Sequence, residues 1–353
     1  MFTYGDNDTY QLWYVQEKEN FRKDVAVINL SMLGLPVYAD MLKKKNVVLF
    51  KTPAAFYGDE RSDICYIDEE KNDSSTVPMS FTSSLQMIFA NRDSIVKANN
   101  NDQRIIYYPQ KTVYIPLNNE EFNKISSIKT MNDRIEFDLN SYLFIGDLLQ
   151  LDIITSNINR RPIYFSSRPS DYLGDHCIQQ GIVYRVFPMT NMKADEIAKK
   201  EIPPLEKFAE TTYKPVIGFE INGRKNVSSD GNNTFFQLYA RIADYYKSNK
   251  NKTKAAEWLT KAAAQLKEIS IENMPGGYSF ATAYLDVDNE KAKTYFEVYC
   301  LYLFDKYKQP AALKGYLSKA DCLKQVEEIN KYLKDKKLES TVINSIIKKL
   351  KVN

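Results

Sequence analysis

The chain has 353 residues, of which 44% are apolar and 26% are charged, and its formal net charge is +3. This length allows two or three domains, and the composition is that of a globular protein. The small net charge argues against nucleic acid as a partner, because nucleic-acid-binding domains usually carry a strongly basic face. No apolar run approaches the roughly 20 residues of a membrane span and no signal-peptide pattern is visible, so the sequence predicts a soluble chain.

The cysteines and the one histidine limit the possible chemistry. The cysteines have neither zinc-site nor disulfide-framework spacing, and a single histidine cannot supply a multi-histidine metal site or the usual Ser-His-Asp triad. We therefore predict no cofactor and no metal centre. Asp175 and His176 are adjacent and form an acid–base pair on paper, but a lone histidine in a loop is usually structural. The four cysteines are Cys65, Cys177, Cys300 and Cys322.

The first half of the chain alternates strand and helix patterns. The apolar runs "FTY", "DVAVINL" (24–30) and "NVVLF" (46–50) are typical of buried strands, and "TYQLWYVQEKE" and "PVYADMLKKK" between them are typical of helices. This order predicts an α/β domain with a mostly parallel sheet and right-handed crossovers. Further helices are expected near 80–90 and 146–158, a polar loop at 68–76, and further strands at "RIIYY", "TVYIPL", "RIEFDL", "PIYFSS" and "IVYRVF".

The second half changes character. Residues 1–190 are predicted to form the α/β domain, 191–231 a connector with two short helices and a turn-rich stretch, and 232–353 an all-α domain. The all-α domain begins with the spacing of a tetratricopeptide-like repeat, in which small residues let paired helices approach and aromatic residues fill the gap. The residues at these positions are Tyr239, Ile242, Ala243, Tyr246, Ala255, Leu259 and Ala262.

A second, degenerate repeat follows the first. Its members are Ala281, Tyr284, Ala292, Phe296 and Tyr299. Such repeats are unstable alone, so they must stack on each other or on neighbouring elements. The final stretch "STVINSIIKKLKVN" has one apolar face, which suits a helix that closes the array or, alternatively, a membrane-surface or partner helix.

Candidate binding residues follow the predicted strands. Ligands of parallel sheets bind outside the carboxyl ends of the strands. The polar residues at these ends would form a crevice with both charge signs, suited to hydroxyls, a phosphate or a divalent ion. They are Asp6 and Asp8 after the first strand, Asn29 and Ser31 after the second, Lys51 after the third, and Ser166, Ser167 and Arg168 after "PIYF".

Simpler interpretations of several of these residues stay open. Asp8 stands three residues before Gln11, which is also the arrangement of a helix capping box. Two aspartates do not complete a Ca²⁺ or Mg²⁺ shell, and both the dinucleotide fingerprint and the P-loop pattern are absent. Arg160 and Arg161, just before the "PIYF" strand, are either the solvated end of a strand or an anion clamp.

Three segments together resemble a known family. They are "GDNDTYQLWYVQEKENFRKDVAVINLSML", "RRPIYFSS" and "YLGD…QQGIVYRVFP", followed by the tetratricopeptide-like helices. They look like the large membrane-protein family of unassigned function, common in Bacteroidetes, that is related to protein O-mannosyltransferase-like glycosyltransferases. Members carry a polytopic amino-terminal half and a soluble carboxy-terminal half. The resemblance covers essentially the whole chain and implies that it corresponds to the soluble half, which a buried strand beginning at residue 2 also suggests.

The resemblance also implies a role. In such glycosyltransferases the catalytic acidic residues lie in loops of the membrane half, so this chain is not expected to be an enzyme by itself. It would lie on the periplasmic face of the cytoplasmic membrane, with the membrane half and an acceptor protein or glycan as partners. Two alternatives remain: a self-standing α/β enzyme that uses Asp6 and Asp8 on a sugar or phosphate substrate, and an interaction protein that works through its repeats alone.

Overall fold

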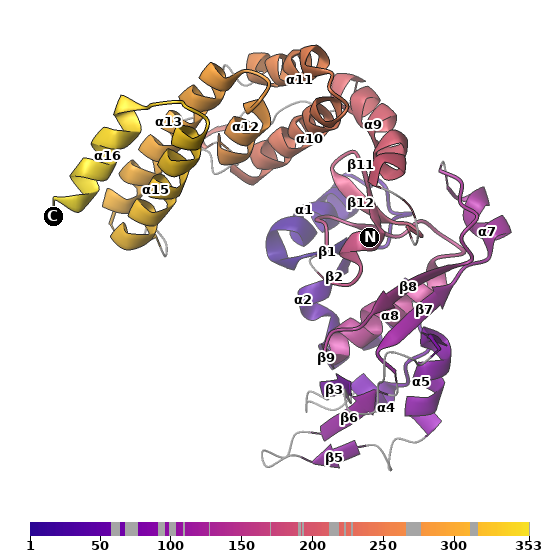
Figure 1. The fold of residues 1–353 in the computed structure, drawn as a ribbon. Coiled ribbons are helices and arrows are strands. Elements are labelled where there is room, and N and C mark those ends of the chain that lie inside the picture. Colours follow the sequence, from indigo (N-terminus) through magenta and orange to yellow (C-terminus); the bar gives the residue numbers. More distant parts are fainter. Residues whose placement is uncertain are drawn as a thin grey trace. The chain divides into compact units, whose positions relative to one another are not determined.

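The computed structural model describes residues 1–57, 64–67, 77–90, 96–98, 104–108, 110–126, 128–169, 171–189, 192, 194–211, 219–221, 224–226, 229–265, 277–310 and 317–352. The chain divides into two compact units, Met1–Glu201 and Ile202–Asn353. Figure 1 shows strands and helices mixed in the first unit and helices in succession in the second. The predicted polar loop at 68–76 lies outside the described residues.

Short strands form three mixed sheets in the described part of the first unit. One has the order β11-β12-β10-β1-β2, another β5-β6-β3-β9, and another β4-β7-β8. The strands are β1 (Phe2–Thr3), β2 (Ile28–Asn29), β3 (Ile64–Ile67), β4 (Met79–Ser80), β5 (Val96–Ala98), β6 (Arg104–Tyr108), β7 (Thr112–Pro116), β8 (Arg134–Asp138), β9 (Tyr142–Phe144), β10 (Tyr164–Phe165), β11 (Cys177–Gln180) and β12 (Val183–Val186).

The helices of the first unit connect and cover these strands. They are α1 (Gly5–Lys18), α2 (Leu30–Leu33), α3 (Pro36–Lys44), α4 (Ala54–Tyr57), α5 (Phe81–Ala90), α7 (Asn119–Lys124), α8 (Ile145–Asn157) and the short 3₁₀ helix η1 (Gly174–His176). The helices predicted in "TYQLWYVQEKE", "PVYADMLKKK", 80–90 and 146–158 are confirmed as α1, α3, α5 and α8. Their apolar periodicity and, for α3, the proline in its first turn made them visible in the sequence.

The prediction of a mostly parallel sheet is wrong. In the five-stranded sheet, β1 is parallel to β10 and to β2, but β12 is antiparallel to both β10 and β11. The β11–β12 hairpin turns at Gly181, whose φ of 67° is in the left-handed region that glycine tolerates. A turn this short returns the chain antiparallel, whereas a parallel pair needs a long crossover.

The predicted strand "NVVLF" (46–50) does not form. Side chains from α8 and the turn after it take the backbone groups that a neighbouring strand would have used. Asn157 accepts from the Leu49 amide through Oδ1 at 3.3 Å and donates to the Leu49 carbonyl through Nδ2 at 2.7 Å. Asp152 Oδ2 accepts from the amides of Lys51 and Thr52 at 2.7 and 2.6 Å. The backbone groups of Leu49 and the amides of Lys51 and Thr52 therefore have partners without a strand ladder.

Helix α8 is the centre of the first unit's core. Leu148, Leu149, Leu151, Ile153 and Ile154 are all buried, so the helix is covered on nearly every side. Its first turn packs closely on the end of α2, because Gly146 and Gly34 face each other: a Cβ on Gly146 would lie 3.3 Å from the Gly34 nitrogen. One apolar cluster extends from the strands through α8 to α3 and α5.

The second unit is mostly helical where it is described. Its elements are α9 (Ala194–Thr211, which begins in the first unit), the hairpin β13 (Phe219–Ile221) and β14 (Arg224–Asn226), α10 (Ser229–Ser248), α11 (Lys252–Gln265), α12 (Gly277–Tyr284), α13 (Asn289–Lys308), α15 (Lys319–Asp335) and α16 (Thr341–Lys351). Consecutive helices pack as the pairs α10–α11, α12–α13 and α15–α16 around a separate apolar core.

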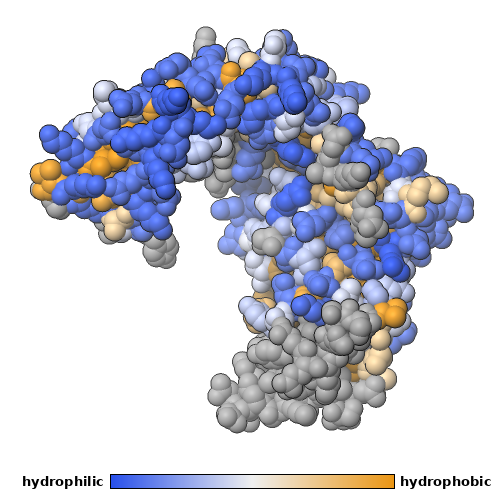
Figure 2. Space-filling view, in the orientation of Figure 1, coloured by the Kyte–Doolittle hydropathy of each residue, from blue (hydrophilic) through white to orange (hydrophobic). Residues whose placement is uncertain are grey.

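The face of this unit visible in Figure 2 is mostly hydrophilic. The apolar face of α16 is not free: Ile343, Ile346 and Leu350 are buried, and the helix packs on α13 and α15. This is the arrangement expected of a helix that closes an array. Among the described residues, no helix is both long and apolar enough to cross a membrane.

Candidate functional site

The carboxyl ends of β1 and β10 bring two predicted residues together. Phe2 pairs with Phe165, their rings lie 5.1 Å apart, and the Ser166 amide donates to the Phe2 carbonyl at 2.9 Å. This register places the Ser166 hydroxyl against the first turn of α1, where it donates to Asp8 Oδ2 at 2.5 Å. Two residues 158 positions apart therefore meet where β1 and β10 end. We call this end of the sheet the carboxyl edge.

Helix α1 begins earlier than the capping-box interpretation of Asp8 requires. Gly5, with a φ of 65°, makes the turn out of β1, and Tyr4 is the N-cap residue. Asp8 consequently lies inside the first turn, so the proposed capping box with Gln11 is wrong. Its Oδ2 instead reaches back to the Tyr4 amide at 3.4 Å, and its charge is favourable near the positive end of the helix dipole.

Asn29 joins the first two strand–helix turns. It is buried, its Oδ1 accepts from the Ser31 amide at 2.9 Å as the N-cap of α2, and its Nδ2 donates to the Gly5 carbonyl at 3.3 Å. Its own amide donates to the Tyr38 hydroxyl at 3.0 Å. Asn29 therefore holds the starts of α1 and α2 in place from a buried position, while the Ser31 side chain is exposed.

Three residues that the sequence analysis missed complete this edge. The Tyr4 ring stacks on Phe165 at 6.4 Å, and burial together with the charges of Asp171 and Asp8 raises the pKa of its phenol. Burial raises the pKa of the Asp171 carboxyl, and the charge of Asp147 adds to the effect. Burial likewise raises the pKa of Asp147, which lies in the first turn of α8. Only the sheet order could have shown that these three converge.

Arg168 is held by the loop that follows β10. Its Nη1 donates to the Gly174 carbonyl at 2.9 Å, its Nη2 lies 3.9 Å from the buried Glu201 carboxylate, and its guanidinium stacks over Tyr184 at 5.3 Å. Gly174 is required there, because a Cβ would lie 2.4 Å from the Pro169 carbonyl oxygen. The side chain of Arg168 remains 42% exposed, so one part of it faces solvent at this edge.

The prediction that Lys51 directly follows a strand is wrong. The strand that would have preceded it does not form, and its amide is bonded to Asp152 on α8 instead. Asp6, in contrast, is exposed on α1, where its carboxylate raises the pKa of the Tyr10 hydroxyl. Tyr10 and Tyr14 are also exposed, by 51% and 60%, so α1 presents aromatic rings beside a carboxylate.

The pair Asp175 and His176 has the character of a structural feature. His176 is buried beside Phe137, with ring centroids 6.2 Å apart, and burial lowers the pKa of its imidazole, so it is neutral at pH 7. Asp175 is exposed. In the part of the chain that the structure describes, no group of three or more His, Cys, Asp or Glu side chains could hold a metal ion.

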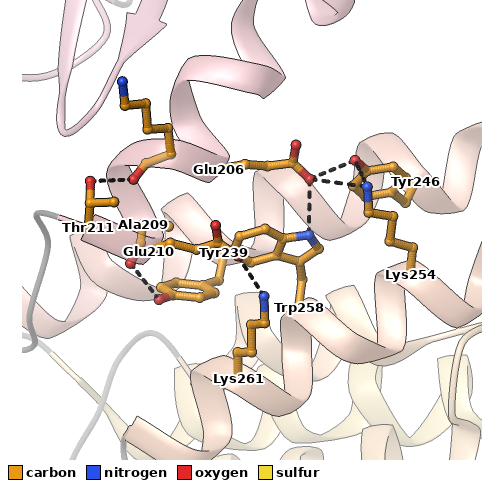
Figure 3. A network of polar contacts seen from close by, with 10 residues as sticks. Glu206, Ala209, Glu210, Thr211, Tyr239, Tyr246, Lys254, Trp258 and Lys261 are labelled. Atoms are coloured by element: carbon orange, nitrogen blue, oxygen red, sulfur yellow. Dashed lines mark hydrogen bonds and ion pairs between the residues drawn. The ribbon is translucent and has the colours of Figure 1, made fainter.

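The predicted repeat residues lie where α9, α10 and α11 pack. Six of them are buried: Tyr239, Ile242, Ala243, Ala255, Leu259 and Ala262. Tyr246 is half-buried and belongs to the polar network of Figure 3, in which Glu206 Oε1 accepts from the Tyr246 hydroxyl at 2.6 Å and from Trp258 Nε1 at 3.1 Å. Lys254 donates to the same hydroxyl at 2.7 Å. These contacts fix α9 on the first helix pair.

Fold and edge together define a class: a mixed α/β domain with a polar edge of carboxylates and hydroxyls, in a chain that also carries a helical unit. The sequence model of the family described as TMEM260-associated domain 2 matches residues 1–203, more than half of the chain, and the chain belongs to this family. The match coincides with the first compact unit, Met1–Glu201. No curated protein and no solved structure matches the chain.

Proposed function

We propose that the chain is an extracytoplasmic accessory domain of a membrane glycosyltransferase-like protein, and that it recognises an acceptor protein or glycan rather than transferring sugar alone. Membership of the TMEM260-associated family supports this role, as does the sequence resemblance to O-mannosyltransferase-related proteins. In this proposal the domain works at the periplasmic face of the cytoplasmic membrane. It is tethered there through the membrane half of the same or a neighbouring protein.

The observation that carries the proposal is the grouping of Tyr4, Asp8 and Ser166 at the carboxyl edge, beside Asp6 and Tyr10 on α1. Carboxylates accept hydrogen bonds from sugar hydroxyls, and a serine hydroxyl can both donate and accept. Exposed tyrosine rings offer an apolar face with a polar tip, which suits a ligand that is apolar on one face and hydroxylated at its margin. A glycan has this chemistry.

The helical unit is the second part of the proposed recognition surface. We interpret α10–α11 and α12–α13 as tetratricopeptide-like repeats, on the spacing of their small and aromatic residues and on the burial of those residues between the helices. Helical repeats commonly present extended surfaces to protein partners. The acceptor protein is therefore assigned to this unit and its glycan to the carboxyl edge.

Glycan binding can be tested on the 353-residue chain with an array of mannose-containing and other bacterial glycans. The double change Asp6→Asn and Asp8→Asn should lower binding at least tenfold, because two acceptors lose their charge. The matched control is Glu120→Gln with Glu121→Gln, which removes two carboxylates from the first turn of α7. Circular dichroism melts of both variants report whether the fold survives.

Each outcome has a defined meaning. Loss of binding in the Asp6/Asp8 variant alone, with the fold retained, supports recognition at the carboxyl edge. Equal binding by both variants and the wild type would place recognition elsewhere and contradict this part of the proposal. Reconstituting sugar transfer from a lipid-linked donor, with and without this chain, tests the accessory role: transfer that does not need the chain contradicts it.

A second candidate is a self-standing enzyme acting on a sugar or phosphate substrate. Burial raises the pKa of the Asp147 and Asp171 carboxyls, which is the direction of shift that a catalytic general acid requires. Turnover of nitrophenyl glycosides or nitrophenyl phosphate that disappears in Asp6→Asn with Asp8→Asn would support it. Absence of turnover in the wild type leaves the accessory role as the better explanation.

A further inference from the structure

The first unit contains a cavity of about 630 Å³ at the amino ends of the parallel strands of the five-stranded sheet. We call this end of the sheet, which is opposite the carboxyl edge, the amino edge. Phe2, Ile28 and Ile163, at the amino ends of the parallel strands β1, β2 and β10, line it together with Ile153 of α8. These four side chains are buried and give the cavity an apolar base. Its volume is within the range of small-molecule sites, which are mostly apolar with a few placed polar groups.

Three arginines line the same cavity: Arg22, Arg160 and Arg161. Arg22 is already paired, because its Nε and Nη2 each donate to Asp24 at 2.8 Å. Among the described residues that line the cavity, Asp24 is the one acidic residue, so no described carboxylate in the lining balances the charges of Arg160 and Arg161.

The bonding of Arg160 and Arg161 leaves donors for a ligand. Arg161 makes one long hydrogen bond, from Nη1 to the Val47 carbonyl at 3.4 Å. Within the described ranges, no hydrogen bond or ion pair involves the Arg160 side chain. A guanidinium carries five N–H donors in a planar fork, so most of the donors of this pair are free to bind an anion bidentately.

The loop that carries Arg22 and Asp24 is fixed from α1. Asn20 and Arg22 both have left-handed backbones, with φ values of 53° and 52°, which costs free energy at non-glycine residues. Gln16 stabilises this conformation, because its Nε2 donates to the carbonyls of Arg22 and Val25 at 2.9 and 2.8 Å. The rim of the cavity is therefore a built feature of the fold.

We propose that this cavity binds an amphipathic anion: a molecule whose apolar body lies on Phe2, Ile28 and Ile153 and whose phosphate or carboxylate head is held by Arg160 and Arg161. Both heads accept paired N–H donors, which is why arginine, more than lysine, recognises them. The site does not depend on the function proposed for the opposite edge.

The test uses decyl phosphate, decanoate and decanol with the 353-residue chain, each below its aggregation limit, by titration calorimetry. We expect both anions to bind and decanol to bind at least tenfold more weakly. The double change Arg160→Ala and Arg161→Ala should remove this preference. Lys348→Ala with Lys349→Ala, a loss of two charges on α16, should leave it unchanged.

A further variant tests the apolar body. Val183 lines the cavity from β12, and Val183→Trp should block the decyl chain and weaken both anions while Arg160 and Arg161 remain. Stronger binding of decyl phosphate than of decanoate would identify the head as phosphate, and the reverse order as carboxylate. The Asp6→Asn/Asp8→Asn variant should bind as the wild type, so failure here and failure of the glycan proposal are distinguishable.

Three results would overturn the proposal. One is equal binding of decanol and the two anions, since it would leave no role for the arginines. Another is unchanged anion binding in the Arg160/Arg161 variant when its spectrum shows a native fold. The last is the absence of binding by either anion up to millimolar concentrations in the wild type.

Discussion

The two edges of the five-stranded sheet use their polar residues in opposite ways. At the carboxyl edge, the Ser166 hydroxyl after β10 donates to Asp8 after β1, and Asn29 at the end of β2 donates to the Gly5 carbonyl after β1. These hydrogen bonds connect the ends of the three strands. At the amino edge, Arg160 and Arg161 line an open cavity and make little contact with the protein. Polar side chains that follow a strand therefore do not by themselves indicate a cavity, because they can form hydrogen bonds with other parts of the protein instead.

The openness of the amino edge has a cause in the segment 46–52. A third parallel strand there would have extended the sheet beyond β2. Instead, Asp152 and Asn157 hold the segment on α8, and Val48 within it becomes part of the cavity wall. The segment that α8 holds therefore forms part of the cavity wall.

Removing the Asp152 carboxylate, which holds the segment 46–52, is expected to have the largest effect. It should affect the cavity at the amino edge and leave the carboxyl edge unchanged. Asp152 is buried, and its two oxygens accept from the Lys51 and Thr52 amides and from the hydroxyls of Thr52 and Ser156. Asp152→Ala leaves these donors buried without an acceptor, so we expect a loss of about 3 kcal/mol in the free energy of unfolding. Thermal melts, with hydrogen exchange of the 46–52 amides, measure it.

The control is Ser156→Ala, which removes one hydroxyl from the other oxygen of the same carboxylate. We expect it to cost less than about 1 kcal/mol. In Asp152→Ala the 46–52 amides should exchange faster and the binding of decyl phosphate should fall, while the carboxyl edge keeps its protection. Comparable costs for the two variants would contradict the assignment of Asp152 as the main support of the cavity wall.

A smaller effect is expected at the carboxyl edge. Asp8→Ala removes the acceptor of the Ser166 hydroxyl and of the Tyr4 amide in a half-buried position, and it also removes a favourable charge from the first turn of α1. We expect a loss of about 1–2 kcal/mol. Hydrogen exchange should show opening at the start of α1 and after β10.

The paired variant Ser166→Ala completes a double-mutant cycle with Asp8→Ala. If the two side chains stabilise the edge through each other, the cost of the double variant should be less than the sum of the single costs. Additive costs would show that the hydrogen bond between them contributes nothing of its own. Anion binding in the cavity should be unchanged in all three variants.

The sequence predicted the elements whose periodicity is local and missed what depends on distant partners. Helices α1 and α3 follow from their own residues, whereas "NVVLF" has the same apolar pattern whether it pairs with a strand or is held by side chains of a helix 100 residues away. Asp8 and Ser166 were found because each follows a strand directly. Asp147 was missed because the strand before it, β9, was not predicted, and Asp171 because it lies further along the loop after β10.

The cavity was beyond sequence analysis for a related reason. Arg160 and Arg161 were recognised as an anion clamp or a solvated strand end, but no pattern in the sequence states that Val48 and Ile153 leave a space beside them. The volume of a cavity depends on which side chains of distant segments do not pack against one another. The residue types predicted which polar groups lie at each edge. Only the three-dimensional structure showed that one edge is bonded within the protein and the other lines a cavity.

The smallest expected effect concerns the charge of Asp171 at the carboxyl edge. Burial and the Asp147 charge raise the pKa of this carboxyl in the folded state. The folded state therefore binds more protons than the unfolded state, and the stability this gives is present at acidic pH and is lost as pH rises through the folded pKa. At pH 7 the ionised carboxylate thus disfavours the folded state.

Asp171→Asn removes this charge and keeps an oxygen for the Leu173 amide, which donates to Asp171 Oδ1 at 3.0 Å. We expect the variant to be more stable than the wild type at pH 7, by less than about 1 kcal/mol, and the difference to vanish in acid. Melting curves from pH 4 to pH 8 measure it, with the exposed Asp175→Asn as control. If the acid at this edge serves ligand binding, the more stable variant should also bind glycan less well, since sites often retain groups that cost stability. A variant that is less stable at pH 7, or equally stable at every pH, would show that the carboxylate is well accommodated and would remove the reason to regard it as part of a site.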